Sequence, residues 1–95
     1  EMGRTPKPDT PQWGRGHWSH CCPAVLAGAG IRGGTAYGRS DKDAAWPHDQ
    51  PVSPEDLTAT IFHALGISPD TRIRDGSGRP VPIVEGGRPL VDLLG

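Results

Sequence analysis

Two residues near the start of the chain have side chains that could bind a metal ion. Glu1 opens the segment Glu-Met-Gly-Arg-Thr-Pro, and His17 lies in the segment Gly-Arg-Gly-His-Trp. A carboxylate oxygen is a hard ligand and an imidazole nitrogen a borderline one, so the pair suits a divalent metal ion. Both residues lie in turns that contain glycine, as metal ligands at the edge of an α/β sheet often do. The pattern predicts a metal site that includes Glu1 and His17.

Three further histidines are weaker candidates. A single histidine is more often a surface or hydrogen-bonded residue than a metal ligand. His20 could supply a second nitrogen, but its spacing from His17 is a loop spacing, with no helical geometry to align the two rings. His48 lies elsewhere in the chain, and His63 falls on a predicted helix, outside its apolar stripe. We therefore expect His63 at the surface.

Other reactive or charged residues have structural explanations beside their chemical ones. Three arginines could present guanidinium groups to a sulfate or phosphate, although each is also an ordinary loop residue: Arg4, Arg15 and Arg32. Asp41 and Asp43 are typical of an Asx-type turn. The adjacent cysteines Cys21 and Cys22 form no Cys-x-x-Cys motif, and we expect them to be small buried side chains.

Residues 28–33 match the Gly-x-Gly-x-x-Gly pattern of dinucleotide-binding proteins. That motif requires a helix that opens at its third glycine and points its N-terminus at the pyrophosphate. Here Gly33 is followed by Gly-Thr-Ala-Tyr-Gly, which cannot start a good helix. The segment therefore predicts a glycine turn after a strand, without a dinucleotide.

One helix is strongly predicted, from about Pro54 to Leu65. Ser53 is a favourable N-cap residue, Pro54 suits the first helical position, and Asp56 completes a variant of the capping box. Gly66 follows at the position where a helix commonly ends in left-handed geometry. These local signals agree with one another.

The remaining elements are shorter. Leu57, Ile61 and Leu65 form an apolar stripe on the predicted helix, and this stripe must pack on something. Residues 24–27 are a continuous apolar run that predicts a strand buried on both faces. We expect one or two helical turns over residues 89–94 and loops over residues 1–20 and 28–51.

The composition indicates a segment of a larger domain. Only 34% of the residues are hydrophobic, whereas 14 glycines and 11 prolines make up 25 of the 95 residues. So few apolar side chains offset the conformational entropy of folding poorly. We therefore expect residues 1–95 to be the C-terminal segment of a domain whose N-terminal half is absent, with the remainder of that domain as the packing partner.

The charge distribution excludes some partners. The formal net charge is −1, and acidic and basic residues are mixed along the chain. No basic stripe with interleaved aromatic residues indicates nucleic-acid binding. No apolar run approaches the roughly 20 residues that span a bilayer. We therefore expect neither nucleic acid as a partner nor a membrane-spanning segment.

Several segments, in order along nearly the whole chain, carry a family resemblance. They are Glu-Met-Gly-Arg-Thr-Pro at 1–6, Gly-Arg-Gly-His-Trp at 14–18, the glycine-rich segment 24–34, Pro-Val-Ser-Pro-Glu-Asp-Leu-Thr-Ala-Thr at 51–60, His-Ala-Leu-Gly-Ile at 63–67 and Gly-Arg-Pro-Val-Pro at 78–82. Together they resemble the C-terminal part of the sulfatase-like Domain of Unknown Function 1501 family, in the alkaline-phosphatase superfamily. The combination is far more specific than any single segment.

The resemblance implies an α/β fold in which a mixed sheet is flanked by helices. It places Glu1 and His17 at positions where relatives hold a divalent metal ion, such as calcium, zinc or manganese. It implies a metal-dependent hydrolase of sulfate or phosphate esters, with a small molecule or a polysaccharide as substrate, in a secreted or periplasmic location. The nucleophile would lie in the N-terminal half, so this segment alone would be inactive.

Two positions depart from the family pattern. Met2 replaces the usual phenylalanine of Glu-Phe-Gly, and Gly16 replaces an aspartate that often precedes the histidine. A carboxylate role at position 16 is therefore missing. The alternative interpretation is a non-catalytic module on the same fold, which binds a polyanion or a protein.

Overall fold

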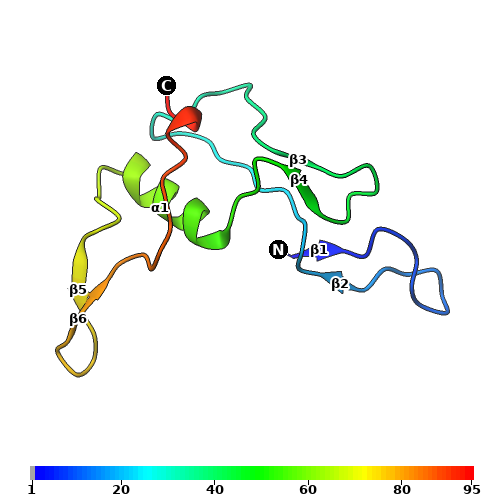
Figure 1. Cartoon of the computed structure of the whole chain (residues 1–95), viewed down its shortest axis with the longest axis horizontal. Coiled ribbons are helices and arrows are strands. Elements are labelled where there is room, and N and C mark those ends of the chain that lie inside the picture. Colours follow the sequence, from blue (N-terminus) through cyan, green and yellow to red (C-terminus); the bar gives the residue numbers. More distant parts are fainter. Residues whose placement is uncertain (1) are drawn as a thin grey trace. The chain divides into compact units, whose positions relative to one another are not determined.

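The structure is a computed structural model that describes residues 2–95, and it contains one α-helix and three two-stranded antiparallel hairpins (Figure 1). The elements in order are β1 (Gly3–Arg4), β2 (His17–Trp18), β3 (Arg39–Ser40), β4 (Pro47–Asp49), α1 (Pro54–Ala64), β5 (Arg72–Arg74), β6 (Pro80–Pro82) and the 3₁₀ helix η1 (Val91–Leu93). The chain divides into two structural units. Unit 1 comprises residues 1–26 and 36–51, and unit 2 comprises residues 27–35 and 52–95.

Unit 1 contains the first two hairpins. In the first, β1 pairs with β2, and Gly3 lies opposite Trp18 and Arg4 opposite His17. In the second, β3 pairs with β4, with Arg39 opposite Asp49 and Ser40 opposite Pro47. Both hairpins were predicted as loops, and the prediction was wrong because two- or three-residue strands show no readable alternation of apolar and polar residues.

The helix α1 belongs to unit 2, and its predicted ends are confirmed. The Ser53 hydroxyl accepts a hydrogen bond from the Asp56 amide, and the Asp56 carboxylate accepts one from the Ser53 amide, which completes the capping box. At the other end, the amide of Gly66, with φ of 78°, donates to the His63 carbonyl. The amide of Ile67 donates to the Phe62 carbonyl, which gives a Schellman motif.

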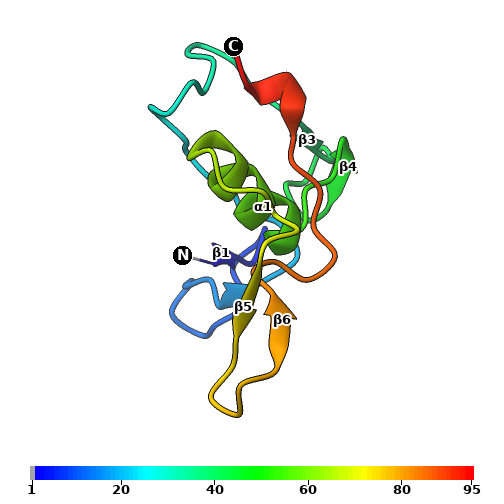
Figure 2. The same ribbon diagram turned by 90° about the vertical axis from the view of Figure 1, so that its left-hand side faces the viewer.

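Two side chains of α1 fasten the C-terminal part of unit 2. The second oxygen of Asp56 accepts the Arg88 amide at 2.9 Å. The buried hydroxyl of Thr60 accepts the Leu90 amide at 2.9 Å and donates to the Asp56 carbonyl at 2.7 Å. Gly87 passes so close to the backbone of Glu55 that a β-carbon there would overlap it. The chain therefore runs back along α1 from β6 to η1 (Figure 2).

The other contacts of unit 2 are formed by backbone pairing. In the β5–β6 hairpin, Ile73 lies opposite Val81. Ile31 forms a β-bridge with Leu94, and the Arg32 amide donates to the Leu93 carbonyl at 2.8 Å. The turns predicted near the end of the chain are confirmed as η1. No helix follows Gly33, which confirms that the Gly-x-Gly-x-x-Gly match is a turn.

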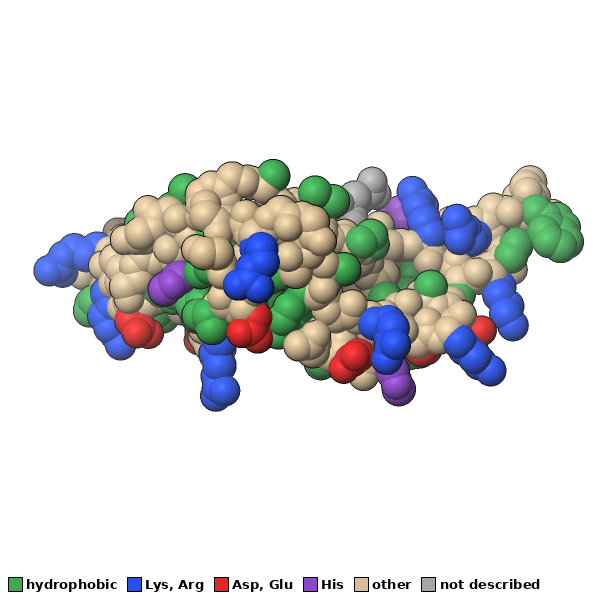
Figure 3. All heavy atoms as spheres, turned by 90° about the horizontal axis from the view of Figure 1, so that it is seen from above, with side chains coloured by type: hydrophobic (Ala, Val, Ile, Leu, Met, Phe, Trp, Pro, Cys, Tyr) green, Lys and Arg blue, Asp and Glu red, His purple; other side chains and the backbone are tan. Residues whose placement is uncertain are grey.

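Very little of the described chain is buried. Ala59 and Thr60 are the only fully buried residues among residues 2–95. Two members of the predicted apolar stripe are open to solvent, Ile61 at 41% and Leu65 at 62% exposure. Hydrophobic side chains reach the surface at many places (Figure 3). Polar and backbone contacts therefore hold these elements more than an apolar core does.

Two expectations about the middle of the chain were wrong. Residues 24–27 form no strand, and Val25 is 93% exposed, because none of the described residues pairs with this run. Cys22 is exposed and Cys21 half-buried, and both are free thiols rather than buried ones.

None of the helices found in residues 2–95 has the length and apolar character that crossing a bilayer requires.

The burial pattern predicts weak cooperativity for the 95-residue chain by itself. Its exposed apolar side chains should bind a hydrophobic dye, and its thermal unfolding should be broad, because little apolar area is lost from water on folding. Differential scanning calorimetry and dye fluorescence measure both properties. A sharp transition without dye binding would contradict this expectation.

A second prediction concerns acid. The Arg88 amide, followed by the Ser53 amide and hydroxyl, lowers the pKa of Asp56 below its usual value. The folded state therefore binds fewer protons than the unfolded state near pH 4. The stability that Asp56 contributes is present above its unfolded pKa of about 3.9 and is lost as the pH falls through the lower, folded value. In the full-length protein, urea unfolding between pH 3 and pH 6 should show a smaller pH dependence in Asp56→Asn.

Asp70→Asn is the matched control, because the Asp70 carboxylate accepts no hydrogen bond from the described residues. It removes the same charge and should leave the slope near that of the parent. Equal slopes in the two variants would contradict the assignment to Asp56.

Candidate functional site

The β1–β2 hairpin determines the surroundings of His17. Residues directly opposite each other in an antiparallel pair project to the same face, so His17 shares a face with Arg4, and Trp18 lies on the other face. His17 is exposed, and its ring accepts or donates no hydrogen bond within residues 2–95. Its nitrogens are therefore available to a ligand. Glu1, the other predicted metal ligand, lies outside the described residues.

On the opposite face, three aromatic rings pack together. The Trp18 and Trp46 rings meet edge to face at 5.6 Å, and the His20 ring lies 4.8 Å from Trp18 and 4.3 Å from Trp46. The Trp18 indole N–H donates to the Ala45 carbonyl at 2.7 Å. His20 is thus a packing residue of this aromatic cluster. The two-residue spacing from Trp18 was the available signal, since such residues share one face of an extended chain.

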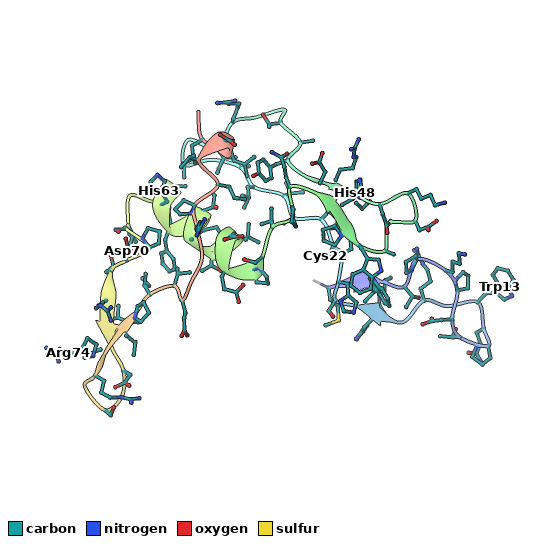
Figure 4. All side chains as sticks on the ribbon, viewed as in Figure 1. Trp13, Cys22, His48, His63, Asp70 and Arg74 are labelled. Atoms are coloured by element: carbon teal, nitrogen blue, oxygen red, sulfur yellow. The ribbon has the colours of Figure 1, made fainter. Side chains whose placement is uncertain are left out.

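The loop between β1 and β2 is held by side-chain contacts. The Asp9 carboxylate accepts the Gly16 amide at 2.8 Å, and the Thr10 hydroxyl accepts the Gly14 amide at 2.8 Å. At the tip, Trp13 is 82% exposed and projects away from the ribbon (Figure 4). Trp13 has φ of 59°, a left-handed conformation that is uncommon for a bulky residue. The loop therefore holds a large apolar side chain in water.

The contact between Asp9 and Gly16 bears on the family departure at position 16, where glycine replaces the usual aspartate. A β-carbon at Gly16 would lie 3.1 Å from a carboxylate oxygen of Asp9. The Asp9 carboxylate therefore occupies the space beside position 16, one residue before His17. The missing aspartate at position 16 leaves a carboxylate nearby, supplied from a different place in the loop.

The predicted Asx-type turn at Asp41 is confirmed. The Asp41 carboxylate accepts the amides of Ala45 at 2.9 Å and Asp43 at 3.2 Å. These amides, that of Ala45 foremost, lower the pKa of Asp41 below its usual value. The Asp41 amide also donates to the Trp46 carbonyl. Because Trp18 binds the Ala45 carbonyl, this turn is tied to β2.

The three arginines considered for oxyanion binding lie in different settings. Arg4 is in β1 and Arg15 in the following loop, both in unit 1. Arg32 belongs to unit 2, where its guanidinium donates to the Leu94 carbonyl at 3.2 Å. Arg32 therefore has a structural role at the end of the chain.

A metal centre cannot be built from the described residues alone. Within residues 2–95, no three side chains of His, Cys, Asp or Glu converge on one point. A metal ion at His17 would therefore need further ligands from outside these residues, and Glu1 is the candidate that the sequence offers.

With this geometry established, comparison with known proteins assigns the family. The family described as "Protein of unknown function (DUF1501)" matches residues 1–94. The chain belongs to this family. No curated protein and no solved structure matches the chain. The family that the motifs resemble is thereby confirmed over nearly the entire length of this DUF1501 chain.

The contribution of the aromatic cluster to stability can be tested by substitution. In the full-length protein, Trp18→Phe keeps a ring but removes the indole N–H, which leaves the Ala45 carbonyl without its donor. We expect a loss of about 1 kcal/mol in the free energy of unfolding, the usual net value of one such hydrogen bond. The near-ultraviolet circular dichroism of the coupled indoles should also weaken.

Trp13→Phe is the matched control, since the exposed Trp13 ring contacts little. It should change neither stability nor the coupled signal of Trp18 and Trp46. A similar loss in both variants would contradict the role assigned to Trp18.

Proposed function

We propose that this DUF1501 chain is the C-terminal, metal-ligand-bearing segment of a metal-dependent hydrolase of the sulfatase and phosphatase type. Its substrate would be a sulfate or phosphate ester of a small molecule or a polysaccharide. The observation that carries the proposal is the pairing of β1 with β2. This pairing brings the segment that follows Glu1 alongside His17, so that two motifs separated in sequence form one hairpin.

The properties of His17 and Arg4 suit such a site. An exposed imidazole without a protein partner can coordinate a divalent ion, and a guanidinium on the same face can bind an ester oxyanion. A bound divalent metal would polarise the ester oxygens. The hydrolytic nucleophile would come from the N-terminal half of the parent domain.

The helix α1 supports a role within a larger fold. Its ends are completely capped, yet Ile61 and Leu65 on its surface remain exposed. A helix whose apolar side chains lack cover needs a packing partner. We infer that the remainder of an alkaline-phosphatase-like domain, a mixed sheet flanked by helices, supplies that partner, and that α1 is structural rather than catalytic.

The second candidate function is a non-catalytic module that binds a polyanion or a protein. The tip of the β1–β2 loop favours it. Trp13 is 82% exposed on a loop held by Asp9 and Thr10, with Arg15 two residues along the chain. Tryptophan and arginine are enriched among residues that dominate binding at interfaces.

Metal content separates the ligand role of His17 from a structural one. In the full-length protein, His17→Ala and Glu1→Gln should each lose bound metal and hydrolysis of sulfate or phosphate esters, while retaining the fold. Atomic emission spectrometry after loading with calcium, zinc or manganese measures the metal. In a metal-bound structure, the Glu1 and His17 ligand atoms should lie within about 5 Å of each other across the shared ion.

Ser53→Ala is the control for this experiment. Loss of the N-cap hydrogen bond should lower stability by about 1 kcal/mol. Metal content and turnover per folded molecule should stay unchanged. Full metal occupancy in His17→Ala would show that the histidine is only a hairpin residue and would overturn the proposal.

A further inference from the structure

In the β5–β6 hairpin, the outer edge of β6 is closed to further pairing. Its first and last residues, Pro80 and Pro82, have no N–H, so the hydrogen-bonded pair of the ladder is Ile73 with Val81. Backbone groups of successive residues point to alternate edges of a strand, so those of the two prolines face outward. Because this edge has no outward N–H, it cannot form a full ladder with another strand.

The outer edge of β5 is open. Arg72 and Arg74 lie opposite the two prolines, so both direct their N–H and C=O groups away from β6. The next pair agrees with this register, because the Asp75 amide donates inward to the Arg79 carbonyl at 2.9 Å. Within residues 2–95, the outward groups of β5 form no backbone hydrogen bond. Two donors and two acceptors, spaced as a neighbouring strand requires, are therefore available on this edge.

The side chains at this edge carry uncompensated positive charge. Arg72 and Arg74 are exposed, and they share one face of the hairpin because they lie two residues apart on a strand. Neither forms an ion pair with the described residues. The Arg74 guanidinium donates to the neutral Gly78 carbonyl at 2.8 Å, and Figure 4 shows Arg74 on the outer side of the hairpin. The adjacent carboxylate of Asp75 pairs with Arg79 instead, at 3.0 Å.

Charged and apolar side chains alternate along β5. Between the two arginines, Ile73 is 49% exposed and lies opposite Val81 on the other face of the hairpin. Residues directly opposite each other on paired strands share a face and interact. A strand that complements β5 would therefore place acidic residues opposite Arg72 and Arg74 and an apolar residue opposite Ile73.

A second copy of β5 is a poor match for this edge. If two β5 strands paired antiparallel about Ile73, Arg72 of each copy would lie opposite Arg74 of the other. Like charges directly opposite each other destabilise a sheet. Parallel pairing in register would also bring arginines side by side. The arginines therefore oppose self-association of the edge, as charged side chains on edge strands commonly do.

We propose that the outer edge of β5 binds an extended acidic segment of a partner protein, which adds a third strand to the hairpin. The backbone of that segment bonds to the outward N–H and C=O groups of Arg72 and Arg74. Its acidic side chains pair with the two guanidinium groups. The surface lies in unit 2 and uses none of the residues proposed to bind metal, so it is independent of the proposed function.

The test uses the full-length protein at low ionic strength and a short blocked peptide of alternating glutamate and valine. Titration calorimetry should show saturable binding, whereas a peptide of alternating lysine and valine should not bind. Hydrogen–deuterium exchange should slow at the amides of Arg72 and Arg74 in the complex, because these amides then donate to the peptide. Unaltered exchange at both amides would show charge attraction without strand pairing and would overturn the proposal.

Backbone methylation of the peptide separates strand pairing from charge attraction. In the proposed register the glutamate amides point at β5 and the valine amides point away from it. N-methylation of the glutamates should abolish binding, and N-methylation of the valines should preserve it, although both peptides carry the same charge. Equal affinity of the two methylated peptides would contradict the proposed pairing.

Substitutions in the protein test the charged side chains. Arg72→Gln and Arg74→Gln should each weaken binding of the acidic peptide about threefold, the usual effect of one exposed ion pair. Lys42→Gln is the matched control, because Lys42 is exposed, lies in unit 1 and removes the same charge. It should bind the peptide as the parent does, and equal weakening in all three variants would overturn the proposal.

Two further measurements separate the alternatives. Slow exchange at the Arg72 and Arg74 amides before any peptide is added would show that another segment or a second copy already covers the edge, and would overturn the proposal. His17→Ala should keep peptide binding, so this proposal and the metal proposal can fail separately.

Discussion

Aspartate carboxylates that accept backbone N–H groups hold the turns of this protein together. Asp9 does so in the β1–β2 loop, Asp41 in the β3–β4 turn, Asp56 at the start of α1, and Asp75 in the β5–β6 turn. In Asp75 the carboxylate also accepts the Arg79 side chain at 3.0 Å. Each of these carboxylates satisfies amides that would otherwise need water or a longer ladder, because the strands are only two or three residues long.

This constraint explains how short hairpins hold their shape without an apolar core. A turn closed by a carboxylate fixes the strands on either side of it, and those strands carry His17, Arg39 and His48. In the aromatic cluster, the indole N–H of Trp18 in β2 donates to the Ala45 carbonyl and so joins the β3–β4 turn to β2. Loops held by polar contacts carry the candidate site, and the elements need little buried area to do so.

The same constraint determines how much could be predicted from the sequence. The capping box at Ser53 and Asp56 and the Asx turn at Asp41 were predicted correctly because each depends on residues within four positions. The bulge at His48 was not predicted because the register of a hairpin cannot be read from residue types alone. The packing of His20 on Trp46 was not predicted because Trp46 belongs to the segment of another hairpin. The prediction of a strand at 24–27 was wrong because a continuous apolar run forms a strand only where neighbouring strands pair with it.

For the candidate site too, some features could be predicted from the sequence and others could not. The residue types at Glu1 and His17 and the family resemblance indicated metal chemistry, and family membership is confirmed over residues 1–94. The register of the first hairpin places Arg4 opposite His17, and no short sequence motif predicts that register. Sequence therefore indicated which residues to consider, while the arrangement of their neighbours needed the structure.

The net charge of −1 results from acidic and basic residues that are mixed along the chain. A nearly neutral chain exerts little long-range attraction on an anion, so recognition depends on donors at short range. In unit 1 the carboxylates of Asp9 and Asp41 are turned toward backbone amides, whose dipoles offset part of their charge. Arg4 and Lys42 form no ion pair or side-chain hydrogen bond with the described residues, whereas His48 lies near enough to the Asp41 carboxylate to help lower its pKa. The turns of unit 1 are thus closed by acidic side chains, and Arg4 and Lys42 take no part in closing them.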